Sequence, residues 1–179
     1  EYAAVSAKAN EISDQLKRFG IRVKFDNRTT HKPGFKFNEY ELKGVPLRIA
    51  IGPKDLENGT VELARRDTLT KEVAAVDGIA NLVVDLLEQI QQALFQKAES
   101  FRNEHITAVD SYDEFKELLE TKGGFFAAHW DGTAETEERI KDETKATIRC
   151  IPLDRTLEAG SCMYSGKPSI GRVLFAKAY

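Results

Sequence analysis

The sequence predicts an α/β protein in which helices alternate with short strands and which is divided into two domains. Three observations predict this class. A helical apolar pattern ends at Gly20 and passes directly into an alternating strand pattern, a long apolar stripe marks a helix in the middle of the chain, and the second half again alternates helix and strand patterns. The 179 residues suffice for one large or two small domains with a substantial core.

From the N-terminus, apolar residues at steps of three or four predict a helix over 2–19, which Gly20 ends. Apolar residues alternate with basic ones over 21–25, a pattern that predicts a half-buried strand. Residues 27–36 are expected to form a polar loop, and residues 38–43 a short helix. The joint of helix, glycine and strand is typical of α/β domains.

A second alternating segment, 47–51, predicts a strand that ends at the turn signal Gly52-Pro53. Asn58-Gly59 then precedes a candidate hairpin partner over 61–64. The longest apolar stripe predicts one helix from about 77 to 104, whose polar second half is expected to leave the core and connect two domains.

The second half begins with a short amphipathic helix for which Ser111 is the expected N-cap. Thr133 is the expected N-cap of a further helix, whose first turn is rich in glutamate, as the helix dipole favours. Strands are expected over 125–130, 147–153 and 172–177. We expect Cys150, in the middle of the second of these strands, to be a buried small apolar residue.

Composition excludes several classes of protein. Charged residues make up 31% and hydrophobic residues 41%, which is typical of soluble globular domains, and no run approaches the roughly 20 apolar residues that span a bilayer. The N-terminus shows no signal-peptide pattern, and the two cysteines are too few for a disulfide scaffold, so we expect a cytoplasmic protein with no membrane partner. A net charge of -3 argues against a protein that coats DNA or RNA through bulk charge, but it allows a local basic patch.

Two parts of the sequence resemble one family. Residues 34–55, GFKFNEYELKGVPLRIAIGPKD, resemble the anticodon-binding domain of prolyl-tRNA synthetases. Residues 144–153, TKATIRCIPL, and residues 166–179, which end in RVLFAKAY, resemble the extra C-terminal domain of the eukaryote- and archaeon-like branch of that family, in which the chain also ends on tyrosine, here Tyr179.

The resemblance implies a class II anticodon-binding domain over 1–98 and the C-terminal prolyl-tRNA synthetase domain over 99–179. The first is expected to be a three-layer-like mixed-sheet domain, lacking its first strand if the chain begins inside the first helix. The second is a small α/β domain.

The resemblance also implies a function. The parent enzyme is a proline–tRNA ligase, a class II aminoacyl-tRNA synthetase that uses ATP with magnesium and is a homodimer in this family. Its catalytic core is not recognisable here, so we expect the chain to bind proline tRNA and support that core without catalysing a reaction or holding a cofactor itself. The alternative is a free-standing tRNA-binding or protein-interaction module with the same two domains. A small enzyme in its own right lacks any visible catalytic constellation.

The candidate site follows from the chemistry of guanine, since every proline anticodon ends in two guanines. The pairing edge of guanine offers two N–H donors and a carbonyl, which suit a carboxylate and a cation respectively. The resemblance places the anticodon readers at Glu41, Arg48, Lys54 and Asp55. Arg65 and Arg66, after the next strand, are further candidates for contact with phosphate or base.

The family's C-terminal domain holds zinc with four cysteines, and here only one of them is present. Alignment on neighbouring residues places Asp131, Thr136, Cys162 and Ser165 at the four ligand positions. Hydroxyl groups are poor replacements for thiolates, so zinc is not expected, although a rebuilt site with His129 and Cys162 is conceivable. We expect the loop from Asp131 to be held by a turn and by the cap at Thr133.

Overall fold

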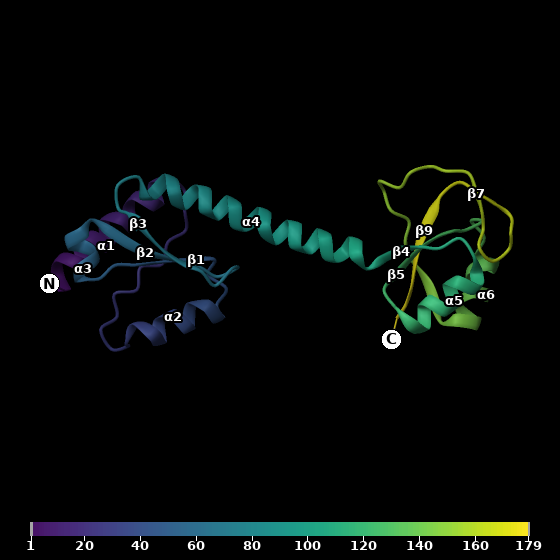
Figure 1. Cartoon of the computed structure of the whole chain (residues 1–179), viewed down its shortest axis with the longest axis horizontal. Helices are drawn as coiled ribbons and strands as arrows, with labels where there is room; N and C mark the ends of the chain where they lie inside the picture. The colour runs from purple at the N-terminus through teal and green to yellow at the C-terminus, as the bar shows by residue number, and fades with distance from the viewer. Residues whose placement is uncertain (1, 179) are drawn as a thin grey trace. The chain divides into compact units, whose positions relative to one another are not determined.

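A computed structural model describes residues 2–178, so Tyr179, the last residue of the resembling segment, lies outside the described residues (Figure 1). The chain divides into two compact units, Glu1–Lys97 and Ala98–Tyr179. Within the described range, no helix is both long enough and apolar enough to cross a membrane. The predicted α/β class is confirmed, because each unit combines helices with an open sheet.

The first unit contains a three-stranded antiparallel sheet in the order β1-β2-β3. Leu47 pairs with Arg65 and Ile49 with Leu63 across β1 and β2. The elements in chain order are α1 (Tyr2–Arg18), α2 (Pro33–Leu42), β1 (Leu47–Ala50), α3 (Pro53–Asn58), β2 (Thr60–Arg65), β3 (Lys71–Ala75) and α4 (Ile79–Glu104), which continues into the second unit.

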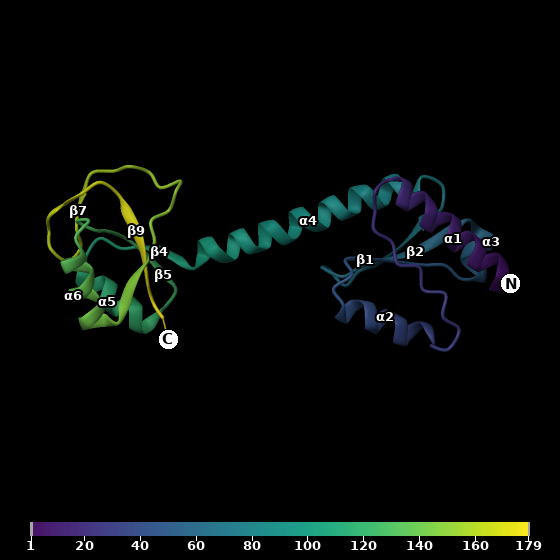
Figure 2. The same ribbon diagram turned by 180° about the vertical axis from the view of Figure 1, so that it is seen from behind.

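The two faces of this sheet have different coverings. Because side chains alternate along a strand, one face carries the apolar residues Leu47, Ile49, Val61 and Leu63, which pack with buried residues of α1 and α4. Helix α2 lies on the opposite face, as both views show (Figures 1 and 2). No residue of α2 is fully buried, so little apolar packing holds this helix.

The expected strand over 21–25 is wrong. Ile21 and Val23 are half-buried against the core, as the alternation predicts, but the segment forms neither a strand nor a helix. A strand needs a neighbour for its backbone hydrogen bonds, and among the described residues no strand lies beside this segment.

Three other differences concern element boundaries in the first unit. Helix α2 begins at Pro33, inside the expected loop, because proline suits the first position of a helix. Pro53 likewise begins the short helix α3 rather than a turn. Strand β3 is not predicted from the sequence. It is an edge strand, on which the side chain of Val73 is 71% exposed, so it shows no apolar alternation.

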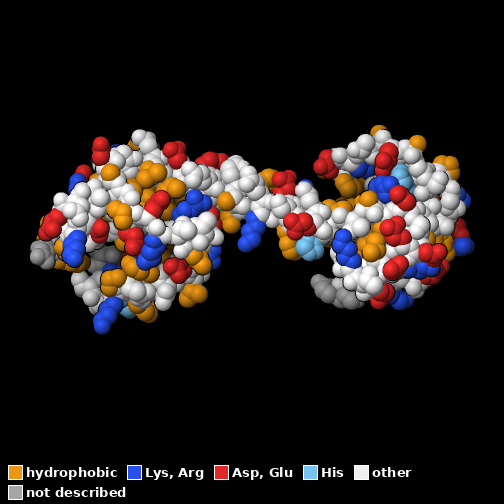
Figure 3. All heavy atoms as spheres, viewed as in Figure 1, with side chains coloured by type: hydrophobic (Ala, Val, Ile, Leu, Met, Phe, Trp, Pro, Cys, Tyr) orange, Lys and Arg blue, Asp and Glu red, His pale blue; other side chains and the backbone are white. Residues whose placement is uncertain are grey.

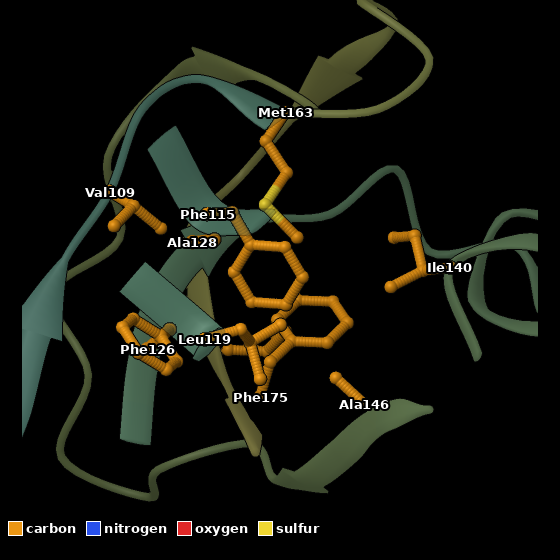
Figure 4. Close-up of a cluster of buried hydrophobic side chains, with 10 residues drawn as sticks. Val109, Phe115, Leu119, Phe126, Ala128, Ile140, Ala146, Met163 and Phe175 are labelled. Atoms are coloured by element: carbon orange, nitrogen blue, oxygen red, sulfur yellow. The ribbon is translucent and has the colours of Figure 1, made fainter. Parts of the chain in front are cut away.

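The second unit contains a four-stranded mixed sheet in the order β4-β5-β9-β6, in which β4 and β5 are parallel. Phe115 of α5 packs edge-on against Phe126 and Phe175, which pair across β5 and β9 (Figure 4). The elements are β4 (Ile106–Ala108), α5 (Tyr112–Thr121), β5 (Phe125–His129), α6 (Ala134–Thr144), β6 (Ala146–Cys150), β7 (Gly160–Ser161), β8 (Pro168–Ser169) and β9 (Arg172–Lys177).

Both N-caps predicted in this unit are confirmed. The Ser111 hydroxyl accepts a hydrogen bond from the Glu114 backbone N–H, and the Thr133 hydroxyl accepts one from the Thr136 N–H. The expected burial of Cys150 is wrong, because this cysteine is exposed. The pairing of β6 with β9 shifts between Ile148 and Cys150, at the end of an edge strand. The alternation of buried and exposed side chains along β6 therefore does not extend to Cys150.

Two adjacent phenylalanines provide a test of this core. Phe126 is fully buried, whereas Phe125 is 40% exposed. Phe126→Ala should lower the free energy of unfolding by about 3–5 kcal/mol, because it leaves a cavity among aromatic rings. Phe125→Ala should cost less than about 1 kcal/mol. Urea unfolding of both variants measures the difference, and equal losses would contradict this packing.

Candidate functional site

A groove separates α2 from the sheet face opposite the apolar core. Its residues come from α2, from the turn that follows it, and from β1 and β2. We call it the α2 groove; it is lined by Phe37, Tyr40, Glu41, Val45, Arg48, Ala64, Arg65 and Arg66. Four of the six sequence-predicted site residues therefore meet here: Glu41, Arg48, Arg65 and Arg66.

Arg48 forms the floor of the α2 groove. Its guanidinium lies 3.6 Å from the centre of the Phe37 ring, and its Nη1 donates to Glu62 Oε1 at 3.2 Å. The ring and the carboxylate together fix the orientation of a cation that is 14% exposed. Its buried Nε has no hydrogen-bond partner among the described residues.

Arg65 and Arg66 have different partners in the structure. Arg65 makes a two-pronged ion pair with Asp67, through Nε–Oδ1 at 3.1 Å and Nη2–Oδ2 at 2.8 Å, and this pair lowers the pKa of Asp67. Arg66 is exposed, and its Nε donates to the Glu41 carbonyl at 2.9 Å. Arg66 is therefore the more accessible cation, while the charge of Arg65 is already compensated.

Lys54 and Asp55 lie at the start of α3, just beyond the end of β1, and they do not line the α2 groove. Lys54 is exposed. The Asp55 Oδ2 accepts the Gly52 backbone N–H at 2.8 Å, so one carboxylate oxygen caps the helix. The structure therefore arranges the six predicted residues as two groups, one in the α2 groove and one beyond the C-terminal end of β1.

A network of ion pairs joins α2 to the loop that precedes it. Arg28 binds Asp26 through Nη2–Oδ2 at 2.7 Å and Glu39 through Nη2–Oε2 at 2.6 Å, and Lys36 reaches the Asp26 carbonyl at 3.2 Å. The hydrogen bond from Arg28 holds the pKa of Asp26 well below its usual range. Hydrogen bonds from Lys43 and Arg28 lower the pKa of Glu39 to about 2. The network therefore stays charged near neutral pH.

Several groove residues were not predicted from the sequence. Phe37 and Tyr40 lie beside the predicted Glu41 on one side of α2, a helix that the sequence placed only over 38–43. The spacing of three and four residues was the available signal. Arg28 carried no signal, because its role depends on Asp26 and Glu39, which only the fold brings together. On the face shown in Figure 3, acidic and basic side chains are interspersed over this unit, consistent with the near-neutral composition.

In the second unit, three of the four presumed metal positions converge on one carboxylate. Asp131 Oδ2 accepts the hydroxyls of Thr136 at 2.8 Å and Ser165 at 2.6 Å, while Oδ1 accepts the Thr133 hydroxyl at 2.8 Å and its N–H at 3.1 Å. We call these four residues the Asp131 cluster. It joins the start of α6 to the loop after β7, two segments that a metal would otherwise connect.

The residues at these four positions do not fit a zinc ion. Each hydroxyl uses its proton on the Asp131 carboxylate, and the set offers one thiol, that of the buried Cys162. Among residues 2–178, no group of three or more His, Cys, Asp or Glu side chains is arranged to hold a metal.

The conceivable rebuilt metal site at His129 has a different environment. Its Nδ1 lies 3.1 Å from the Ser169 hydroxyl, and its Nε2 lies 3.5 Å from Glu158 Oε1. Gly160 packs so closely against the imidazole that an added Cβ would lie 2.3 Å from Nε2. The ring is thus enclosed by structural contacts.

Two family models match the chain. One, described as "Anticodon binding domain", matches residues 2–86, and the other, described as "Prolyl-tRNA synthetase, C-terminal", matches residues 112–179. The proline–tRNA ligase of Flavobacterium psychrophilum is 65% identical over 179 residues, and that of Porphyromonas gingivalis strain W83 is 59% identical. The chain spans only 36% of the length of each of these relatives.

The chain is also similar to solved structures of prolyl-tRNA synthetase. Two crystal structures of prolyl-tRNA synthetase from Cryptosporidium parvum, one complexed with L-proline and AMP and one with halofuginone and AMPPNP, are 33% identical in sequence. Their TM-scores are 0.89 and 0.91, and the matches cover 97% and 98% of this chain but 37% of each of theirs.

The Asp131 cluster makes the second unit sensitive to acid. Burial alone would raise the pKa of Asp131, but hydrogen bonds from Ser165, Thr133 and Thr136 lower it to about 2 from an ordinary 3.8. A lowered pKa means that the charged carboxylate stabilises the folded unit above about pH 4, and that this contribution is lost as the pH falls toward 2.

Asp131→Asn should therefore lower the free energy of unfolding by about 2 kcal/mol at pH 7. As the pH falls from 4 to 2.5, the difference in the free energy of unfolding between this variant and the unmodified protein should become smaller. Urea unfolding at these pH values measures it, with Glu138→Gln, an exposed carboxylate on α6, as the matched control. A difference that does not change with pH would contradict the proposed hydrogen-bonded carboxylate.

Proposed function

The chain belongs to the prolyl-tRNA synthetase family, as its C-terminal, anticodon-binding region, and we propose that it recognises the anticodon of proline tRNA within a proline–tRNA ligase. Under this proposal the full-length protein attaches proline to its tRNA with ATP and magnesium. The 179 residues supply recognition and carry no catalytic group of their own. The anticodon-binding domain would cover 1–98, and the C-terminal domain 99–179.

The single observation that carries this proposal is the meeting of a carboxylate and oriented arginines in the α2 groove. Glu41 can accept the two N–H donors of a guanine edge, and Arg48, held by Phe37 and Glu62, can donate to its carbonyl. Lys54 and the remaining oxygen of Asp55 offer the same pair of functions beside the end of β1. Two guanines therefore find two sets of complementary groups.

The arginines of β2 take unequal parts in this proposal. Arg66 is exposed and lies at the groove, so it is suited to a phosphate or a base. Arg65 contributes through its ion pair with Asp67, which holds the β2–β3 turn.

We further propose that the protein belongs to the eukaryote- and archaeon-like branch, is cytoplasmic and acts as a homodimer whose contacts come mainly from the rest of the polypeptide. The 33% identity to the Cryptosporidium parvum enzyme over almost the whole chain supports the branch. A free-standing tRNA-binding or protein-interaction module remains the alternative, and the sequence of the gene upstream of Glu1 distinguishes the two.

Lys54→Ala and Asp55→Asn in the full-length protein test the anticodon assignment. Asparagine keeps an oxygen that caps α3 but loses the charge, so the second change separates binding from folding. Each should weaken the use of proline tRNA by about 1–3 kcal/mol in kcat/KM, while proline activation with ATP stays normal. Lys141→Ala, on the exposed side of α6, is the control. Unchanged aminoacylation in both variants would overturn these two assignments.

We also propose that the second unit folds without zinc, since the Asp131 cluster connects the segments that the metal would join. Elemental analysis of the purified protein should find no stoichiometric zinc, and a chelator should leave its Tm unchanged. The triple variant Asp131→Cys, Thr136→Cys and Ser165→Cys, which adds three thiols to that of Cys162, is the positive control. About one zinc per chain in the unmodified protein would contradict the proposal.

A further inference from the structure

A wider basin lies beside the α2 groove, at the C-terminal end of α2. The two share Glu41 and Arg66, and the basin has a volume of about 590 Å³. We call it the Leu42–Leu69 basin; it is lined by Asn38, Glu41, Leu42, Arg66, Asp67 and Leu69. Its two apolar residues, Leu42 and Leu69, are not among the six predicted site residues, and the proposed contacts with the two guanines give them no role.

Two leucines of this basin are unusually exposed. Leu42, the last residue of α2, is 89% exposed, and Leu69, in the turn between β2 and β3, is 80% exposed. Neither belongs to the core of its unit. Figure 3 shows hydrophobic side chains among charged ones on this unit's surface, so apolar groups lie within a mainly polar exterior.

The backbone at Leu69 is strained. Its φ of 58° lies in the left-handed region, which a bulky residue rarely adopts. The turn is nevertheless well held, since Arg65 N–H donates to the Thr70 carbonyl at 3.0 Å and the hydroxyls of Thr68 and Thr70 lie 2.7 Å apart. A glycine would relieve the strain, so the leucine side chain itself is the feature that needs an explanation.

The chemistry of the basin suits one unpaired nucleotide. Two leucines offer apolar surface to the face of a base, and the exposed amide of Asn38 offers both donors and an acceptor to its edge. Arg66, held in place by its bond to the Glu41 carbonyl, supplies positive charge for a phosphate. Two leucines around a basin of this size are too few for a stable protein interface, which buries far more surface.

We propose that the Leu42–Leu69 basin binds the nucleotide that directly flanks the two guanines in the anticodon loop, with its base against Leu42 and Leu69. This inference rests on the proposed anticodon recognition and extends it by one nucleotide, because the basin shares the lining residues Glu41 and Arg66 with the α2 groove. The basin would recognise the base through apolar contact and shape. It would therefore add affinity for an unpaired nucleotide of the loop, in addition to the sequence recognition at the two guanines.

The test uses the full-length protein and four RNAs: a proline tRNA transcript, two versions with an abasic site directly 5′ or 3′ of the two guanines, and an anticodon-swapped transcript. Leu69→Gly, which suits the positive φ, and Leu42→Gln remove the two walls. Leu157→Gln, at a leucine that is 73% exposed in the second unit, is the matched control. Binding affinity and proline activation with ATP are measured for every variant.

One of the two abasic RNAs should bind the unmodified protein about 5- to 150-fold more weakly than the intact transcript. The leucine variants should bind the intact transcript more weakly by a similar factor, and the same abasic site should then make little further difference. Proline activation should not change, and Leu157→Gln should behave like the unmodified protein.

Equal affinity for both abasic RNAs would overturn the inference. A loss of proline activation in the leucine variants would overturn it as well, since it would mean that other parts of the polypeptide cover these leucines. If the anticodon swap weakens binding while the abasic sites do not, only the basin assignment fails. If the swap has no effect, the proposed function fails, and the inference fails with it.

Discussion

The two-residue period of β1 and β2 is the constraint on which the first unit depends. It sends Leu47, Ile49, Val61 and Leu63 to the face that α1 and α4 cover, and it leaves Arg48 on the other. A helix on that second face cannot be held by an apolar core. Helix α2 accordingly buries no residue and is held by Arg28, by Arg66 and by the stack of Phe37 on Arg48.

This arrangement gives the groove charged walls that are already oriented before a ligand binds. Arginines held by carboxylates and by an aromatic ring lose little freedom on binding, which favours recognition of a planar, polar edge. The same contacts limit the net positive charge of the groove, because Asp67 compensates the charge of Arg65 and Glu62 compensates that of Arg48. Specific hydrogen bonding, more than net positive charge, is thus the means of recognition that this surface offers.

In the second unit, a carboxylate and its hydrogen bonds connect segments of the chain, whereas in the first unit such groups hold a helix. Two segments far apart in the sequence must be joined at the start of α6, and the Asp131 cluster joins them through one carboxylate and three hydroxyls. The aromatic core of Phe115, Phe126 and Phe175 provides the apolar part of the stability. Hydrogen bonds to a charged carboxylate contribute less free energy than a structural metal does, so this core is correspondingly important.

The sequence alone was sufficient for features that depend on neighbouring residues. The class of fold, helices α1, α4, α5 and α6, and the N-caps Ser111 and Thr133 all follow from local periodicity and local hydrogen bonds, and the resemblance in 34–55 located the candidate readers. Features that depend on distant partners were decided by the tertiary structure. The segment 21–25 has the pattern of a strand but no neighbouring strand to pair with, and Cys150 is exposed because β6 is an edge strand. Likewise, Arg48 and Arg66 have the expected charges, but the fold gives them distant partners, Glu62 and the Glu41 carbonyl, that no periodicity encodes.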